Sequence, residues 1–112
     1  MNEDPLIISA QLTIPAGEIS YRASRSGGPG GQHVNTSATQ VELLWDVQNS
    51  PSLTEAQRER VLAALAGRID AAGVLHLTAS ETRSQLRNRQ VVTERFVRLL
   101  QRALRPRRPR RA

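Results

Sequence analysis

The sequence predicts a small α+β domain: a mainly antiparallel sheet of three to four strands, packed by two helices, with a long glycine-rich loop joining two strands. Three observations lead to this prediction. Residues 39–47 alternate between apolar and polar side chains, as a half-buried strand does. Residues 54–71 and 83–104 repeat apolar side chains at helical spacing. Four of the chain's seven glycines fall within residues 27–31.

The first half of the chain contains the expected strands. Residues 6–8 and 12–14 are short β-prone pieces before Pro15. Residues 19–23 alternate clearly, and the strand at 39–47 gives the best period-2 pattern in the chain. The glycine-rich loop lies between these last two strands, so we expect them to form an antiparallel pair with a long insertion at the turn.

A helix is expected at 54–71, after a turn at 49–51. Gly73 stands where a helix C-cap belongs, and a short strand is expected at 74–79. Two residue pairs have the spacing of a capping box at the helix start: Ser52 with Glu55, and Thr54 with Gln57.

The second helix, 83–104, is expected to end before Pro106. The segment 105–112 consists almost entirely of arginine and proline, so it cannot bury a core and is expected to be disordered on its own. The chain of 112 residues therefore divides into one folded domain, 1–104, and a basic tail, 105–112, which is either short by nature or truncated.

The positive charge is concentrated at one end of the chain. Residues 83–112 hold eleven arginines and one acid, whereas residues 1–82 hold five arginines and nine acids. This asymmetry favours a polyanionic partner that binds the basic end. No lysine is present, which suits bidentate phosphate binding by arginine and equally suits a GC-rich genome.

The composition excludes several classes of protein. With no cysteine, disulfides, thiol catalysis and cysteine-based zinc sites are ruled out. No apolar run reaches the roughly 18 residues of a membrane span. Aromatic residues make up 3% of the chain, which disfavours an RNA-binding platform built on base stacking.

The loop at 24–38 is the candidate active site. Glycine adopts positive φ without steric cost and lets the backbone approach a ligand closely. Long loops without structure of their own are usually functional or disordered. A flexible hairpin tip remains the alternative, because the tripeptide G-G-Q at 30–32 is short enough to occur by chance.

A longer match makes the loop more specific. The stretch G-G-P-G-G-Q-H-V-N-T-S-A-T-Q-V-E-L at 27–43 resembles the catalytic loop of class I peptide-chain release factors. With R-S-Q-L-R-N-R at 83–89 and the small size of the chain, it is similar to the alternative ribosome-rescue factor B family of peptidyl-tRNA hydrolases. The resemblance covers roughly residues 6–104, so 1–104 would be a release-factor-like catalytic domain, named after its GGQ motif.

The resemblance implies an enzyme that hydrolyses peptidyl-tRNA on stalled ribosomes without reading a codon. Gly30 and Gly31 would let the backbone reach the ester in the peptidyl-transferase centre. The backbone N–H of Gln32 would stabilise the developing oxyanion, and its side-chain amide, a candidate for methylation, would admit only water. The loop itself offers no nucleophile with an adjacent base, so ribosomal RNA would complete the site.

Further site residues are expected from the chemistry of the loop and the tail and from the resemblance. Gly27, Gly28, His33 and Asn35 would support the loop; His33 could instead act as a base, and a metal role is not expected. Residues that would contact RNA or brace the loop are Arg83, Ser84, Gln85, Asn88 and Arg89. The tail would bind RNA through Arg105, Arg107, Arg108, Arg110 and Arg111.

The expected partners are the ribosomal RNA of both subunits and peptidyl-tRNA. The protein is expected to act as a monomer, to need no cofactor or metal ion, and to bind no membrane. The expected location is the bacterial cytoplasm, or the mitochondrial matrix for an organellar protein. Two other functions stay open. The chain could be a ribosome- or RNA-binding module without turnover, or it could hydrolyse free peptidyl-tRNA away from the ribosome.

Overall fold

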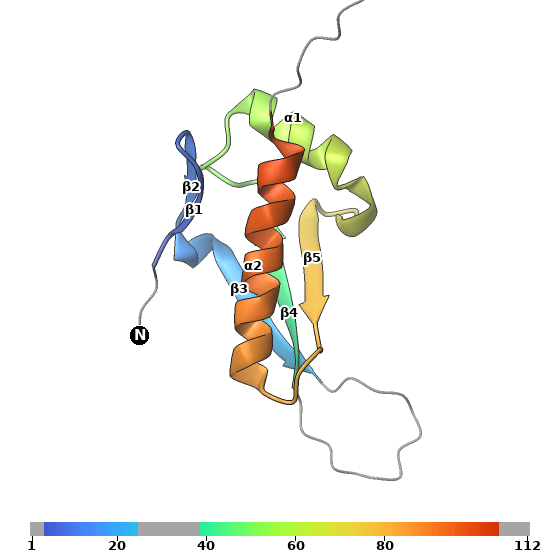
Figure 1. Cartoon of the computed structure of the whole chain (residues 1–112). Helices are drawn as coiled ribbons and strands as arrows, with labels where there is room; N and C mark the ends of the chain where they lie inside the picture. The colour runs from blue at the N-terminus through green and yellow to red at the C-terminus, as the bar shows by residue number, and fades with distance from the viewer. Residues whose placement is uncertain (1–3, 25–38, 106–112) are drawn as a thin grey trace, which may run out of the picture.

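The computed structural model describes residues 4–24 and 39–105. Within these ranges an α+β fold is present, as the sequence predicts (Figure 1). The elements, in chain order, are β1 (Leu6–Ser9), β2 (Leu12–Ile14), the short 3₁₀ helix η1 (Ala16–Glu18), β3 (Ile19–Ser24), β4 (Gln40–Asp46), α1 (Glu55–Ala64), the 3₁₀ helix η2 (Ala66–Arg68), β5 (Val74–Ala79) and α2 (Gln85–Ala103).

The central sheet has three antiparallel strands in the order β3-β4-β5. Its register places Leu43 of β4 between Tyr21 of β3 and Leu77 of β5. The predicted pairing of the strands on either side of the glycine-rich segment is therefore confirmed. The strand expected at 39–47 spans Gln40–Asp46.

Helix α2 packs across one face of this sheet (Figure 1). Trp45 of β4 meets Phe96 of α2 edge to face, with ring centroids 5.2 Å apart, and both side chains are fully buried. This geometry suits the quadrupoles of two aromatic rings. The helix begins at Gln85 and ends at Ala103, close to the predicted range of 83–104.

Strands β1 and β2 form a separate two-stranded hairpin that does not join the central sheet. Its buried side chains, Ile8, Leu12 and Ile14, belong to the same core as the sheet. The amide Nε2 of Gln101 donates to the Ile8 carbonyl oxygen at 3.1 Å and so ties the hairpin to α2. The short β-prone pieces are confirmed as strands. They add buried side chains to the core but do not pair with the central sheet.

The first helix is shorter than the sequence predicts. Instead of running from 54 to 71, α1 ends at Ala64, and η2 covers Ala66–Arg68. Gly67 would cost about 1 kcal/mol relative to alanine inside a helix. Ile69 already has extended backbone angles and pairs with Leu75 of β5. Because Ile69 reaches the core through this extended pairing, the chain must leave the helix before it.

The sequence predicted that Gly73 caps the first helix. In the structure Gly73 instead closes the turn before β5. Its backbone N–H donates to the Asp70 carbonyl oxygen at 2.9 Å, and its own carbonyl oxygen accepts from the N–H groups of Val47 and Gln48. Its φ is 88°, and a Cβ atom here would lie 2.6 Å from the Cβ of Gln48. Both the angle and the close approach therefore require glycine.

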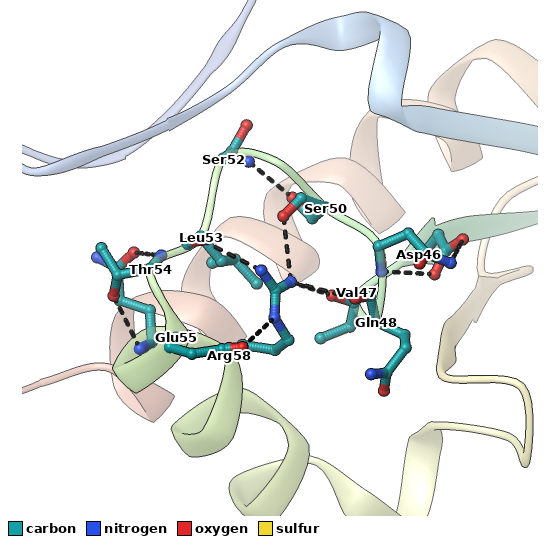
Figure 2. Close-up of polar contacts among 11 residues, drawn as sticks. Asp46, Val47, Gln48, Ser50, Ser52, Leu53, Thr54, Glu55 and Arg58 are labelled. Carbon is teal, nitrogen blue, oxygen red and sulfur yellow. Dashed lines mark hydrogen bonds and ion pairs between the residues drawn. The ribbon is translucent and has the colours of Figure 1, made fainter.

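The segment between β4 and α1 is folded around the guanidinium of Arg58 (Figure 2). Its Nη1 donates to the carbonyl oxygens of Val47, Gln48 and Ser50 at 3.0, 3.3 and 3.1 Å, and Nη2 donates to that of Leu53 at 3.3 Å. Four carbonyl groups of a segment that belongs to no helix or sheet thereby receive a hydrogen bond from one side chain.

Of the two predicted capping boxes, the one at Thr54 is present. Thr54 Oγ1 accepts from the Gln57 N–H at 3.0 Å, and Gln57 Oε1 accepts from the Thr54 N–H at 2.8 Å. The alternative at Ser52 does not form, because the Ser52 hydroxyl donates to Glu18 at 2.5 Å.

Glu18 joins three parts of the fold through its carboxylate. It accepts hydrogen bonds from Trp45 Nε1 at 3.1 Å, from the Ser50 hydroxyl at 2.6 Å and from the Ser52 hydroxyl. Burial favours the neutral acid, but these three donors outweigh it and lower the pKa of Glu18. None of the helices in the described residues is long and apolar enough to cross a lipid bilayer.

Candidate functional site

The fold determines where the glycine-rich segment is attached. Ser24, the last residue of β3, pairs with Gln40, the first residue of β4, and Gln40 Nε2 donates to Ser24 Oγ at 3.2 Å. The N-terminal end of α2 lies at this same end of the sheet (Figure 1). The predicted residues Gly27, Gly28, Gly30, Gly31, Gln32, His33 and Asn35 lie outside the described residues.

Asn88 connects the start of α2 to the point where the chain returns from this segment. Its Nδ2 donates to the carbonyl oxygens of Thr39 at 2.7 Å and Thr82 at 3.0 Å. Its Oδ1 accepts from the Thr82 N–H at 3.0 Å and the Thr82 hydroxyl at 2.9 Å. The side chain is fully buried and uses both amide protons and its oxygen, so Thr39 is held in a defined position.

The other predicted residues at the start of α2 have different environments. Ser84 is the N-cap, and its hydroxyl accepts from the Arg87 N–H at 3.0 Å. Gln85 is the first helical residue, and Arg83 is exposed just before it. Glu81, which precedes the helix, pairs its carboxylate with Arg95.

The electrostatics at this end favour an anion. A helix N-terminus carries partial positive charge, which acidic side chains usually offset. The first turn of α2 has no acidic residue, and Arg83 and Arg87 add positive charge there. A negatively charged group near this end would therefore be attracted by both the helix and the two side chains.

Arg89 is fixed against the sheet by an aromatic ring. Its guanidinium carbon lies 4.1 Å from the ring centroid of Tyr21, within the range of a cation–π contact. The Thr93 hydroxyl donates to the Arg89 carbonyl oxygen, so the Tyr21 hydroxyl must donate to Thr93, at 2.6 Å. Tyr21 and Thr93 are 72 positions apart, and no local pattern indicated their contact.

A shallow cavity of about 250 Å³ opens beside Tyr21 and Arg89. Leu86 forms part of its wall and is 68% exposed, although most large apolar side chains of the described residues are buried. The candidate site thus has an apolar hollow and cationic groups next to the attachment of the glycine-rich segment. Sequence reasoning found Arg89 but missed Tyr21, Thr39, Thr82 and Leu86.

His76 lies on the sheet face opposite α2, away from this site. Its ring nitrogens are 2.8 Å from Asp70 Oδ2 and 2.8 Å from Glu42 Oε2. These hydrogen bonds raise the pKa of His76. No group of three or more acidic or histidine side chains able to hold a metal ion occurs within residues 4–24 and 39–105.

The tail is described only at its first residue. The Arg105 carbonyl oxygen accepts a hydrogen bond from Arg60 Nη2 of α1 at 3.0 Å. Arg107, Arg108, Arg110 and Arg111 lie outside the described residues.

Comparison with known proteins identifies the family. Residues 8–112 match the RF-1 domain. The chain is 38% identical over 95 residues to peptidyl-tRNA hydrolase ArfB of Pseudomonas putida, covering 85% of this chain and 69% of that protein. It is 33% identical over 79 residues to large ribosomal subunit protein mL62 of Mus musculus, covering 70% of this chain and 38% of that protein. The chain therefore belongs to the RF-1 domain family, as a GGQ-domain member of the class I release-factor family.

Proposed function

We propose that this protein is a codon-independent peptidyl-tRNA hydrolase that rescues stalled ribosomes by cleaving the ester between peptide and tRNA in the peptidyl-transferase centre. The main support is the RF-1 domain match over residues 8–112, because that range contains the whole glycine-rich segment. The name of the Pseudomonas putida relative, a peptidyl-tRNA hydrolase, supports the same reaction.

In this proposal the reactive groups lie on the glycine-rich segment. Gly30 and Gly31 would let the backbone approach the ester, and Gly27 and Gly28 would support the loop. The Gln32 N–H donates to the developing oxyanion, which lowers the barrier by stabilising charge that forms only in the transition state. The Gln32 amide, a candidate for methylation, orients water, while His33 and Asn35 support the turn.

The described residues at this end of the fold would support the glycine-rich segment where it joins the sheet. Asn88 holds Thr39 by a buried hydrogen bond, which supports a bracing role for Asn88 over direct contact with RNA. Ser84 and Gln85 would complete the helix start, and Arg83 and Arg89 would contact ribosomal RNA. Positioning of this kind matters because small displacements of a reacting group can cost about 100-fold in rate.

The proposal also assigns roles to the folded domain and the tail, and names the partners and the location. Residues 1–104 form the catalytic domain, and the arginines of 105–112 bind RNA. The protein acts as a monomer without cofactor, on ribosomal RNA of both subunits and peptidyl-tRNA. For a bacterial protein the reaction takes place in the cytoplasm, and for an organellar one in the mitochondrial matrix.

The test is peptide release from ribosomes stalled on a truncated message. Gly31→Ala and Gln32→Ala should each reduce the release rate sharply while the melting temperature stays at the wild-type value. Gly67→Ala is the matched control, because a Cβ atom there meets nothing within 4 Å. Wild-type release by Gly31→Ala would remove the glycine-rich segment from the mechanism.

The same assay separates the two other functions. The name of the mouse relative, a large ribosomal subunit protein, favours a stably bound module as the second candidate. Such a module would bind ribosomes without releasing peptide through repeated turnovers. A hydrolase of free peptidyl-tRNA would cleave its substrate with no ribosome present.

A further inference from the structure

The arginines of the described chain divide into two groups, and the division reveals a second surface. Some have partners: Arg22 pairs with Glu42, Arg58 with backbone carbonyls and Glu55, and Arg95 with Glu81. Arg60 and Arg89 are also engaged, with the end of α2 and with Tyr21. All five of these side chains are therefore engaged within the described chain.

Arg98 and Arg102 are among the other arginines, such as Arg68 and Arg83, whose side chains have no such contact within residues 4–24 and 39–105. Both are exposed on the C-terminal half of α2, and neither forms a hydrogen bond or ion pair through its side chain with any residue of 4–24 or 39–105. They lie four residues apart, so they face the same side of the helix, where like charges repel.

These two side chains line a groove of about 260 Å³. Arg95 lines the same groove and is fixed there, because its Nη1 donates to the Thr78 carbonyl oxygen at 3.0 Å and its Nη2 binds Glu81. The half-buried side chains Val91 and Leu99 also line the groove. Glu94 contributes the one carboxylate among the described lining residues, so the arginines outnumber it.

The groove is separate from the candidate active site. Arg98 lies thirteen residues along α2 from Gln85, which corresponds to about 20 Å of helix. It is on the half of α2 that leads toward α1 and the last described residues (Figure 1). At that end Arg60 of α1 donates to the Arg105 carbonyl oxygen at 3.0 Å.

We propose that this groove binds the phosphate backbone of RNA, with Arg98 and Arg102 as the contacting side chains and Arg95 as a fixed wall. Guanidinium groups fit phosphate oxygens in pairs, and an exposed arginine pair without carboxylate partners matches a regularly charged strand. The choice of RNA as the polyanion rests on the proposed function. The site would anchor the C-terminal half of α2 while the glycine-rich segment acts at the opposite end.

The experiment measures binding of the full chain to a short RNA duplex and to purified ribosomes, from about 50 to about 200 mM salt. Each phosphate contact contributes about 0.7–0.9 to the slope of log affinity against log salt. Arg98→Gln and Arg102→Gln should therefore each reduce the slope by about that amount, and the double variant by about 1.5. Glutamine keeps the helix propensity, so melting temperatures should stay close to wild type.

Arg68→Gln is the matched control, because the Arg68 side chain is exposed and forms no hydrogen bond or ion pair within residues 4–24 and 39–105, but lies in η2 and not on α2. It removes the same charge and should leave the slope at the wild-type value. Equal slopes for Arg98→Gln and Arg68→Gln would overturn the proposal, since the effect would then be one of net charge.

A further variant separates this inference from the proposed function. Gln32→Ala should lose peptide release and keep the wild-type salt slope. If Arg98→Gln lowers the salt slope as expected but no variant affects peptide release, RNA binding in the groove is supported and the hydrolase proposal fails. If Gln32→Ala loses release but Arg98→Gln and Arg102→Gln bind both RNA probes like the control, the groove proposal fails alone.

Discussion

Replacing Asn88 by alanine should weaken both the fold and the proposed reaction. The change removes all four side-chain hydrogen bonds of a fully buried amide. The N–H, hydroxyl and carbonyl groups of Thr82 and the carbonyl of Thr39 then each lose a partner. An unsatisfied buried group costs about 1–3 kcal/mol. Because Thr39 and Thr82 are only half-buried, water can reach part of the vacated space.

We therefore expect a loss of about 2–4 kcal/mol in the free energy of unfolding, below the ~5–15 kcal/mol typical of a whole domain. For a domain of this size that corresponds to a fall of about 10–20 °C in melting temperature. The protein should stay folded at low temperature. Release of peptide should nevertheless slow by about 10- to 100-fold, because Thr39 is no longer held where the chain leaves the glycine-rich segment.

The assay compares Asn88→Ala with Leu100→Ala in single-turnover peptide release, well below both melting temperatures. Leu100 is fully buried on the same helix, and its truncation should cost a similar 2–5 kcal/mol (an approximate range) without touching Thr39. Leu100→Ala should release peptide at the wild-type rate once the folded fraction is equal. Equal slowing in both variants, or a wild-type rate for Asn88→Ala, would refute the reasoning.

Three further predictions concern the turn before β5, the far face of the sheet and the tail. Gly73→Ala should lower the free energy of unfolding by about 1–3 kcal/mol, because its φ is 88° and its Cβ would lie 2.6 Å from Gln48; chemical denaturation measures this, with Gly17→Ala as the control. His76 has a pKa raised above 6.5 by two carboxylates, so its contribution to stability is fully present below pH 6.5 and is lost as pH rises through the folded pKa; His76→Gln should remove this loss in denaturation curves recorded across pH. Deleting 106–112 removes four arginines and should weaken ribosome binding and flatten its salt dependence, measured by co-sedimentation.

Each of these predictions has an opposing outcome. Equal stability of the two glycine variants would show that the turn relaxes around a side chain. A His76→Gln variant whose stability falls as steeply with rising pH as that of the wild type would assign the loss to other groups. Ribosome affinity that is unchanged by the deletion at low and high salt would show that the tail is not an anchor.

Local patterns in the sequence were enough to predict the framework. The alternation in 39–47 predicted β4, and the apolar stripe of 83–104 predicted α2, because burial on one face imposes a fixed period on each element. The capping box at Thr54 depends on residues three apart and was likewise visible. The family resemblance also came from local motifs, and the RF-1 domain match confirms it.

Other features depended on which distant residues meet. The early end of α1 follows from the pairing of Ile69 with Leu75, and the need for glycine at 73 follows from the approach of Gln48. In the sequence these positions looked like a continuing helix and its cap, because periodicity contains no information on what packs opposite each side chain.

The same limit applies to the candidate site. The sequence by itself determined that a glycine-rich segment joins two strands and that the arginines cluster at one end of the chain. Only the tertiary structure decided that Asn88 is buried against Thr39, and that Arg95 is paired while Arg98 and Arg102 are not. The physical reason is that a polar side chain acquires its role from partners brought close by folding, many of which are distant along the chain.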